Sequence, residues 1–154
     1  MRDLVPRRAG VIWSLLLALV YAPVAAQPAT PAGRVKAAVG GASIVRNGQP
    51  QPATVGAVVY ESDTLRTGAD GRLSVMLKDE TRLSLGPATE VALARFTYQP
   101  AEDRLGLVLR MARGVLSYVS GRIAALMPEA VRLETPTAVI GVRGTHALVR
   151  AEAP

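Results

Sequence analysis

Apolar residues alternate with polar ones along most of this chain, which is the pattern of β-strands with one buried face. The clearest example is the segment 72–77, RLSVML, in which leucine and valine alternate with arginine, serine and methionine. The same alternation recurs in four later segments, 82–85, 90–94, 105–110 and 115–120. Each of these segments is predicted to be a strand.

Turn-forming residues separate the predicted strands at intervals of roughly eight to twelve residues, a spacing typical of all-β sandwiches, barrels and rolls. Asn47-Gly48 and Asp70-Gly71 favour tight turns because their residues tolerate a positive φ. Residues 34–39 and 42–46 are predicted as strands, and Gln49–Pro52 as a surface connection. The chain is therefore predicted to be all-β, as a compact β-roll, solenoid-like or sandwich domain of short antiparallel strands.

Three further segments complete the predicted organisation. The strands between residues 72 and 94 are joined by short turns and predict a meander or successive solenoid rungs. The segment 98–103 predicts a polar loop. The segment 122–127, RIAALM, is the one place with local helical propensity, and it is too short to be stable without tertiary contacts.

The closing segment, Val131–Val149, consists of two β-branched runs interrupted by Thr135-Pro136 and by Arg143-Gly144-Thr145. Glycine weakens a plain strand, so Gly144 is expected to mark a bulge or a close backbone approach. Arg143 is expected either to pair with an acid such as Glu134 and lock this bend, or to contact a partner. The structural role is the preferred interpretation.

The first 26 residues have the three parts of a secretory signal peptide, and we expect them to form its helix. Arginines at positions 2, 7 and 8 precede the apolar run Val11–Val20, and small residues follow up to Ala26. This run is shorter than the about 20 residues that a membrane-spanning helix needs. Cleavage before Gln27 is therefore expected, with export to the periplasm or secretion and no stable membrane span afterwards.

Two regions are expected after the signal peptide. Residues 27–33 are rich in proline and alanine without periodicity, which predicts a short disordered leader. Residues 34–150 are expected to form a single β domain.

Composition limits the available chemistry. The chain has no cysteine, which excludes disulfides, thiolate metal sites and an N-terminal lipid anchor on cysteine. Its net charge is +6, and removal of the first 26 residues, with three arginines and one aspartate, lowers it to +4. The cations are spread along the chain and aromatic residues are few, so nucleic-acid binding is not expected.

No catalytic, cofactor or metal site is predicted. His146 is the only histidine, and its position out of phase with Ala147 is expected to direct it toward solvent. A Ser-His-Asp triad would need Asp63 or Asp70 as its acid, and no G-x-S-x-G motif is present. Acidic residues such as Asp79 are explained by turn chemistry rather than by calcium binding. The chain is therefore expected not to be an enzyme.

Three pieces of sequence, in this order, resemble the FecR-type domain family of bacterial envelope proteins: Asp63–Val91, Arg113–Leu116, and the motifs at 134–138 and 142–145. The residues that carry the resemblance are Asp63, Thr67, Gly68, Asp70, Gly71, Gly114, Thr135, Pro136, Arg143, Gly144 and Thr145. The resemblance covers about Val55–Val149 and implies an all-β periplasmic domain. These motif residues are expected to be structural or to contact a partner.

The best-known members of that family are transmembrane regulators that relay a signal from an outer-membrane transporter to a sigma factor. Here a signal peptide stands where those regulators have a cytoplasmic anti-sigma region, and the chain ends soon after the Gly144-Thr145 strand. Sigma-factor control through its own body is therefore not expected. The family often has Asp-Gly-Ser where this chain has Asp79-Glu80-Thr81. Glu80 is expected to avoid a positive φ, because that conformation costs about 1–2 kcal/mol.

The leading hypothesis is a non-catalytic periplasmic interaction or signalling module that binds another envelope protein, with exposed strand edges as one mode of contact. The alternative is a module that binds cell-wall or surface polysaccharide, although few aromatic residues are available to stack on sugars. A hydrolase would need a site that the sequence does not show. No oligomeric state is predicted.

Overall fold

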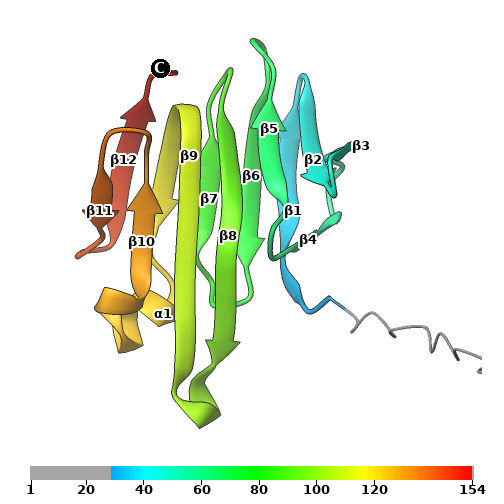
Figure 1. The fold of residues 1–154 in the computed structure, drawn as a ribbon. Coiled ribbons are helices and arrows are strands. Elements are labelled where there is room, and N and C mark those ends of the chain that lie inside the picture. Colours follow the sequence, from blue (N-terminus) through cyan, green and yellow to red (C-terminus); the bar gives the residue numbers. More distant parts are fainter. Residues whose placement is uncertain (1–28, 154) are drawn as a thin grey trace, which may run out of the picture.

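The computed structural model describes residues 29–153, whose strands form one 12-stranded, mostly antiparallel sheet (Figure 1). The strands are β1 (Pro31–Val39), β2 (Ala42–Arg46), β3 (Gln49–Pro52), β4 (Val58–Tyr60), β5 (Thr64–Thr67), β6 (Arg72–Leu77), β7 (Arg82–Leu85), β8 (Glu90–Gln99), β9 (Arg104–Val119), β10 (Val131–Glu134), β11 (Val139–Gly141) and β12 (His146–Ala151). The helical elements are α1 (Arg122–Leu126) and the 3-10 turns η1 (Pro100–Glu102) and η2 (Pro128–Ala130). The predicted all-β class is confirmed, whereas the predicted signal-peptide helix lies outside the described residues.

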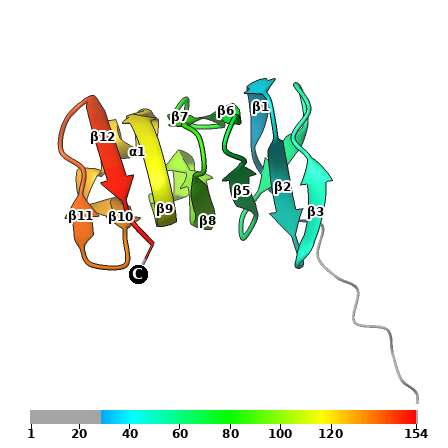
Figure 2. The same cartoon turned by 90° about the horizontal axis from the view of Figure 1, so that it is seen from above.

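The sheet is curled into a half-barrel, so that two half-sheets lie opposite each other (Figure 2). Half-sheet A consists of β4, β1, β6, β7, the second part of β9 and β12. Half-sheet B consists of β3, β2, β5, β8, the first part of β9, β10 and β11. The inward-facing apolar residues of both half-sheets form one buried core.

Strand β9 joins the two half-sheets. Its residues 104–113 pair with β8, and its residues 114–119 pair with β12 on one side and, in part, with β7 on the other. The sequence predicted two separate strands here because Gly114 interrupts the alternation. The chain bends at Gly114, whose φ is 99°, but the strand continues because partners on both sides extend the hydrogen-bonded ladder.

The order of the strands differs from the predicted meander or solenoid. Strands β6 and β7 form a hairpin, but β8 pairs with β5 and β9 rather than with β7. The chain therefore crosses from half-sheet A to half-sheet B after β7. Solenoid rungs would pair in parallel, whereas within residues 29–153 the only parallel pair is β10 with β9. A parallel pair needs a crossover, which α1 and η2 supply. The segment 122–127, for which the sequence indicated local helical propensity, contains α1.

Two predicted boundaries near the N-terminus were wrong. Strand β1 begins at Pro31 rather than at residue 34, so residues 31–33 belong to the sheet and not to a leader. Ala32 is fully buried, and its carbonyl accepts the Lys78 N–H at 2.8 Å. The segment Gln49–Pro52 forms strand β3, not a plain connection. Its prolines are tolerated because β3 lies at a sheet edge, where an N–H is not needed for pairing.

The prediction for Glu80 was also wrong, because its φ is 71°. The Leu77 carbonyl accepts the Glu80 N–H at 3.0 Å, and the Leu77 N–H donates to the Thr81 carbonyl at 2.9 Å. This short hairpin loop needs a left-handed residue before the second strand, a position where glycine is usual. The fully buried Asp79 carboxylate holds the loop in this shape by accepting the Thr81 N–H at 3.1 Å and the Thr81 hydroxyl at 2.7 Å.

Replacing Glu80 with glycine is therefore expected to raise the free energy of unfolding by about 0.5–1 kcal/mol, since it removes the left-handed penalty. The Glu80 side chain otherwise forms only an exposed ion pair with Arg122 at 3.6 Å, which contributes little to stability. Urea denaturation measures the change. Lys78→Gly in the same loop is the control and should destabilise, because Lys78 has no positive φ. A Glu80→Gly variant that is less stable than the wild type would contradict this explanation.

Candidate functional site

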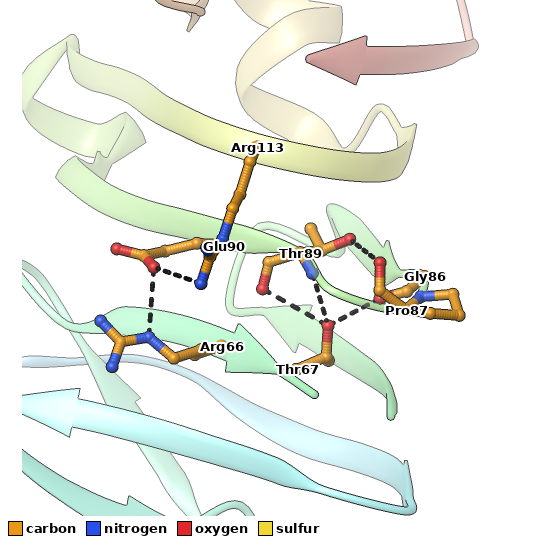
Figure 3. A network of polar contacts seen from close by, with 7 residues as sticks. All are labelled: Arg66, Thr67, Gly86, Pro87, Thr89, Glu90 and Arg113. Atoms are coloured by element: carbon orange, nitrogen blue, oxygen red, sulfur yellow. Dashed lines mark hydrogen bonds and ion pairs between the residues drawn. The ribbon is translucent and has the colours of Figure 1, made fainter. Parts of the chain in front are cut away.

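Thr67, at the end of β5, secures the crossover between β7 and β8. Its hydroxyl donates to the Gly86 carbonyl at 2.7 Å and accepts the Thr89 N–H at 2.9 Å (Figure 3). The Thr67 N–H in turn donates to the Thr89 carbonyl at 2.9 Å. Both threonines are buried, so these bonds form away from solvent. The Thr67 side chain therefore serves as an internal clasp.

Thr89 extends the clasp to the bend of β9. Its hydroxyl donates to the Pro87 carbonyl at 3.0 Å and accepts the Val115 N–H at 2.9 Å. The backbone of Gly114 lies so close to Thr89 that a Cβ on Gly114 would overlap the threonine hydroxyl. Gly114 is thus required both for its positive φ and for this close approach. Thr67, Thr89 and Gly114, here called the threonine clasp, join β5, β8 and β9.

Gly68, Asp70 and Gly71 form the turn that follows Thr67 and hold the turn between β1 and β2. The Gly68 N–H donates to the Gly41 carbonyl at 2.7 Å, and the Gly68 carbonyl accepts the Gly71 N–H at 3.0 Å. The Asp70 carboxylate lies 3.4 Å from the Gly41 nitrogen. These motif residues therefore connect two turns at one end of the half-barrel.

Asp63, at the other end of β5, forms a second internal cluster. Its side chain is 2% exposed and binds the Arg46 guanidinium through two contacts, of 2.9 and 2.8 Å. It also accepts the Tyr60 N–H at 2.8 Å, while Arg46 donates to the Val58 carbonyl at 3.0 Å. The hydrogen bond to Asp63 raises the pKa of Arg46, with burial acting in the opposite direction. This pair ties β2 to β4 and β5.

The outer face of half-sheet B carries paired charges. Glu90 lies 3.2 Å from Arg66 and 3.6 Å from Arg113 (Figure 3), and Glu134 lies 2.6 Å from Arg110. The ion pairs border a shallow groove of about 320 Å³, whose lining includes the motif residues Thr135 and Pro136. Exposed pairs of this kind contribute little to stability.

The C-terminal motif lies apart from the threonine clasp. The Thr135 N–H donates to the Ala138 carbonyl at 2.8 Å and closes the turn between β10 and β11. Arg143 is exposed and does not pair with Glu134, whose partner is Arg110, so the expected Arg143–Glu134 lock is wrong. The Gly144 and Thr145 carbonyls accept bonds from the Ser120 hydroxyl at 2.8 Å and the Ser120 N–H at 2.9 Å, respectively.

His146 is exposed, as the alternation predicted, and its Nε2 lies 2.8 Å from the Ser117 hydroxyl oxygen. Asp63 and Asp70, the acids considered for a triad, are engaged with Arg46 and the Gly41 N–H instead. Within residues 29–153, no group of three His, Cys, Asp or Glu side chains is arranged to hold a metal ion. No helix among these residues is long and apolar enough to cross a membrane.

Asp79 and Tyr118 are both fully buried, which the sequence did not predict. The Asp79 carboxylate accepts the Ile123 N–H at 3.2 Å, so it caps the first turn of α1 as well as the β6–β7 loop. Tyr118 is fully buried, and its hydroxyl has no hydrogen bond of standard geometry to any residue from 29 to 153. Burial, and next the charge of Asp79, raise the pKa of Tyr118 to about 12, while the nearby Thr81 side chain acts in the opposite direction.

Tyr118→Phe is therefore expected to raise the free energy of unfolding by about 1 kcal/mol at pH 7, because it removes an unsatisfied buried hydroxyl. The folded pKa lies above the ordinary 10.0, so the wild type keeps its full stability below pH 10 and loses it as the pH rises toward 12. The difference in the free energy of unfolding between the variant and the wild type should increase from pH 10 to pH 12. Urea titrations at pH 7, 10 and 11 test this, with the half-buried Tyr98→Phe as control; equal pH dependence in both variants contradicts it.

The fold and its clasps define a class: an all-β domain in which polar motif residues join the strands of a curled sheet. The family model described as FecR protein matches residues 63–154, and the chain belongs to this family. The match includes all eleven predicted motif residues. Comparisons with curated proteins and with solved structures gave no match.

The sequence missed the partners of the motif residues. Arg46 binds Asp63 although the two are 17 residues apart in the chain. Thr89 binds Thr67 across a separation of 22 residues. Thr89 carries a weak signal, because a threonine follows Gly86-Pro87 just where a strand resumes. Nothing near Arg46 distinguishes it from the other arginines before the fold is known.

Proposed function

We propose that this chain is a non-catalytic interaction module of the bacterial cell envelope, which takes part in signalling by binding another envelope protein. Membership of the FecR family supports a regulatory role, because proteins of this family act in signalling through envelope partners. The observation that carries the proposal is the inward engagement of the motif. The side chains of Asp63 and Thr67 form hydrogen bonds with other parts of the same chain. The backbone of Gly114 packs closely against Thr89.

The motif residues were expected either to be structural or to contact a partner, and different parts of the motif fit these two roles. Of the N-terminal motif residues, Asp63, Thr67, Gly71 and Gly114 make their contacts within the fold, whereas Gly68 and Asp70 are exposed in the turn after β5. The motif residues after β10 are more exposed, with Pro136, Arg143 and Thr145 open to solvent. Recognition of a partner then falls to the outer faces and edges of the sheet, where side chains are accessible.

We place this module in the periplasm, because residues 1–26 have the sequence of a cleaved signal peptide. Expression of the full chain in a Gram-negative host should give a periplasmic product that begins at Gln27. Mass spectrometry of the intact protein from the periplasmic fraction tests this expectation. A product that retains residues 1–26 in the membrane fraction would contradict it.

The function is tested by crosslinking in living cells, affinity purification of the tagged full chain and identification of the attached proteins by mass spectrometry. The expected result is the repeated recovery of one envelope protein that an unrelated exported β protein does not recover. Sedimentation with purified cell-wall material is the parallel arm. Binding to wall material without any recovered protein would overturn the proposal in favour of a polysaccharide-binding module.

A further inference from the structure

The outer face of half-sheet A, here called face A, is formed by side chains in register across five strands. One row consists of Arg34, Met76, Arg82, Val119 and His146. The next row consists of Ala37, Ser74, Ser84, Ser117 and Leu148. A third row contains Val39, Arg72, Val115 and Arg150. Face A is therefore a regular array rather than a chance collection of surface residues.

Face A carries cations without anions. The strands of half-sheet A contain no aspartate or glutamate, whereas half-sheet B has Glu90 in β8 and Glu134 in β10. Among residues 29–153, no acidic group lies within ion-pair distance of Arg34, Arg72, Arg82 or Arg150, nor of Lys36 in the bulge of β1. Most arginines of half-sheet B have an acidic partner, with Arg95 and Arg132 as the exceptions among the described residues, whereas none of the face A cations has one.

The face A cations gain no ion-pair stabilisation within residues 29–153, although the Arg34 guanidinium donates to the Gly56 carbonyl at 3.1 Å. Arg34 and Arg82 are two strands apart in the same row, which corresponds to about 10 Å at the usual strand spacing. At that distance, similar to the Debye length, like charges repel and add nothing to stability. An array of this kind is therefore best explained by a group of opposite charge that meets it from outside.

Between its cations, face A carries apolar and hydroxyl side chains. Leu148 is 71% exposed, and Met76, Val115 and Val119 are half-buried beside the serines at positions 74, 84 and 117. Apolar side chains interspersed with arginines are typical of protein–protein interfaces. Arg34, Lys36 and Lys78 also line a hollow of about 320 Å³ beside Met76, which offers room for an acidic side chain.

We propose that face A is the docking surface for a partner protein with an acidic face, so that carboxylates of the partner meet the arginines and an apolar group covers Leu148. This inference rests on the proposed function and specifies the surface and the chemistry of the partner. A polysaccharide is disfavoured because face A has no exposed Phe, Tyr or Trp ring for stacking. A second copy of this chain is disfavoured, because Glu90 and Glu134, the acidic residues within its described strands, already pair with arginines.

The first test uses poly-L-glutamate as the probe. The face A variant Arg72→Gln, Arg82→Gln, Arg150→Gln is compared with the control Arg95→Gln, Arg104→Gln, Arg132→Gln, which has the same net charge and leaves face A intact. We expect the face A variant to bind at least tenfold more weakly and the control to stay within about threefold. An equal loss in both would overturn the proposal, because net charge alone would then explain binding. Thermal melts should show both variants folded.

Two further probes identify the class of partner. Alginate presents carboxylates on a polysaccharide, and vesicles of phosphatidylglycerol present an anionic membrane. Tighter binding of the wild type to either of these than to poly-L-glutamate would overturn the assignment of a protein partner. Tighter binding to poly-L-glutamate supports it.

The second test repeats the crosslinking in cells with both variants. Loss of the recovered protein from the face A variant only supports the docking surface. Recovery by the face A variant at the wild-type level overturns this inference while the proposed function stands. If the wild type itself recovers no protein, the proposed function fails and this inference fails with it.

Discussion

Replacing Gly114 with alanine is expected to lower the free energy of unfolding by about 2–5 kcal/mol. A positive φ costs a residue with a Cβ about 1–2 kcal/mol, and the φ of Gly114 is 99°. The new methyl group would also overlap the buried Thr89 hydroxyl, which accepts the Val115 N–H at 2.9 Å. Overpacking and a broken buried hydrogen bond add about 1–3 kcal/mol. Such a loss is a large fraction of the total stability of a domain of this size.

The matched control for this variant is Gly141→Ala. Gly141 has no positive φ, and nothing lies within 4 Å of the position of its missing Cβ, so a change below about 0.5 kcal/mol is expected. Urea denaturation followed by circular dichroism measures both variants. A Gly114→Ala protein with nearly wild-type stability would contradict the role of Gly114 in the bend of β9.

Removing the Asp63 carboxylate should cause the second-largest loss of stability, because an arginine and a backbone N–H then lose their acceptor. Asp63→Ala leaves Arg46 without its two contacts of 2.9 and 2.8 Å, and it leaves the Tyr60 N–H without an acceptor. Breaking a buried ion pair in this way costs about 3–5 kcal/mol. The Arg46 side chain is 29% exposed and keeps some hydration, so we expect a loss of about 2–4 kcal/mol.

Two companion variants separate this explanation from a general effect of the mutation. Asp70→Ala makes the same substitution at an exposed position whose only bond, to the Gly41 N–H, is 3.4 Å long, so it should cost less than about 1 kcal/mol. Arg46→Met in the Asp63→Ala background completes a double-mutant cycle. The second change should then cost much less than Arg46→Met alone, because the two residues act as a pair. Strict additivity would contradict the pairing.

The sequence allowed the strands to be predicted, but not their partners. Two-residue alternation identifies β6 and β7, because one face of each strand is buried and the other is exposed. The place of β8 depends on the long-range pairing of Leu65 with Val91, and no local pattern specifies it. The continuity of β9 could not be predicted for the same reason. Gly114 is typical of a break between strands, and only pairing with the neighbouring strands continues β9 through it.

The candidate site was predicted in part for the same reason. The motif residues were expected to be structural or to contact a partner, and the structure places Thr67 and Gly114 in one clasp. The failed expectation at Glu80 shows how a tertiary contact overrides a local preference, because the buried Asp79 holds the loop against the penalty. Alternation predicts that Arg72 and Arg82 point outward. That their strands lie next to other strands without acidic residues follows only from the fold.

We propose that the chain acts by binding another envelope protein. The most direct test is crosslinking in cells from a photoreactive amino acid placed at Ser84, in the middle of face A, with Ala112 on the outer face of half-sheet B as the reference position. We predict a discrete adduct with one envelope protein from Ser84 and little or none from Ala112. The absence of any protein adduct from either position, in cells that export the folded chain, would contradict this account.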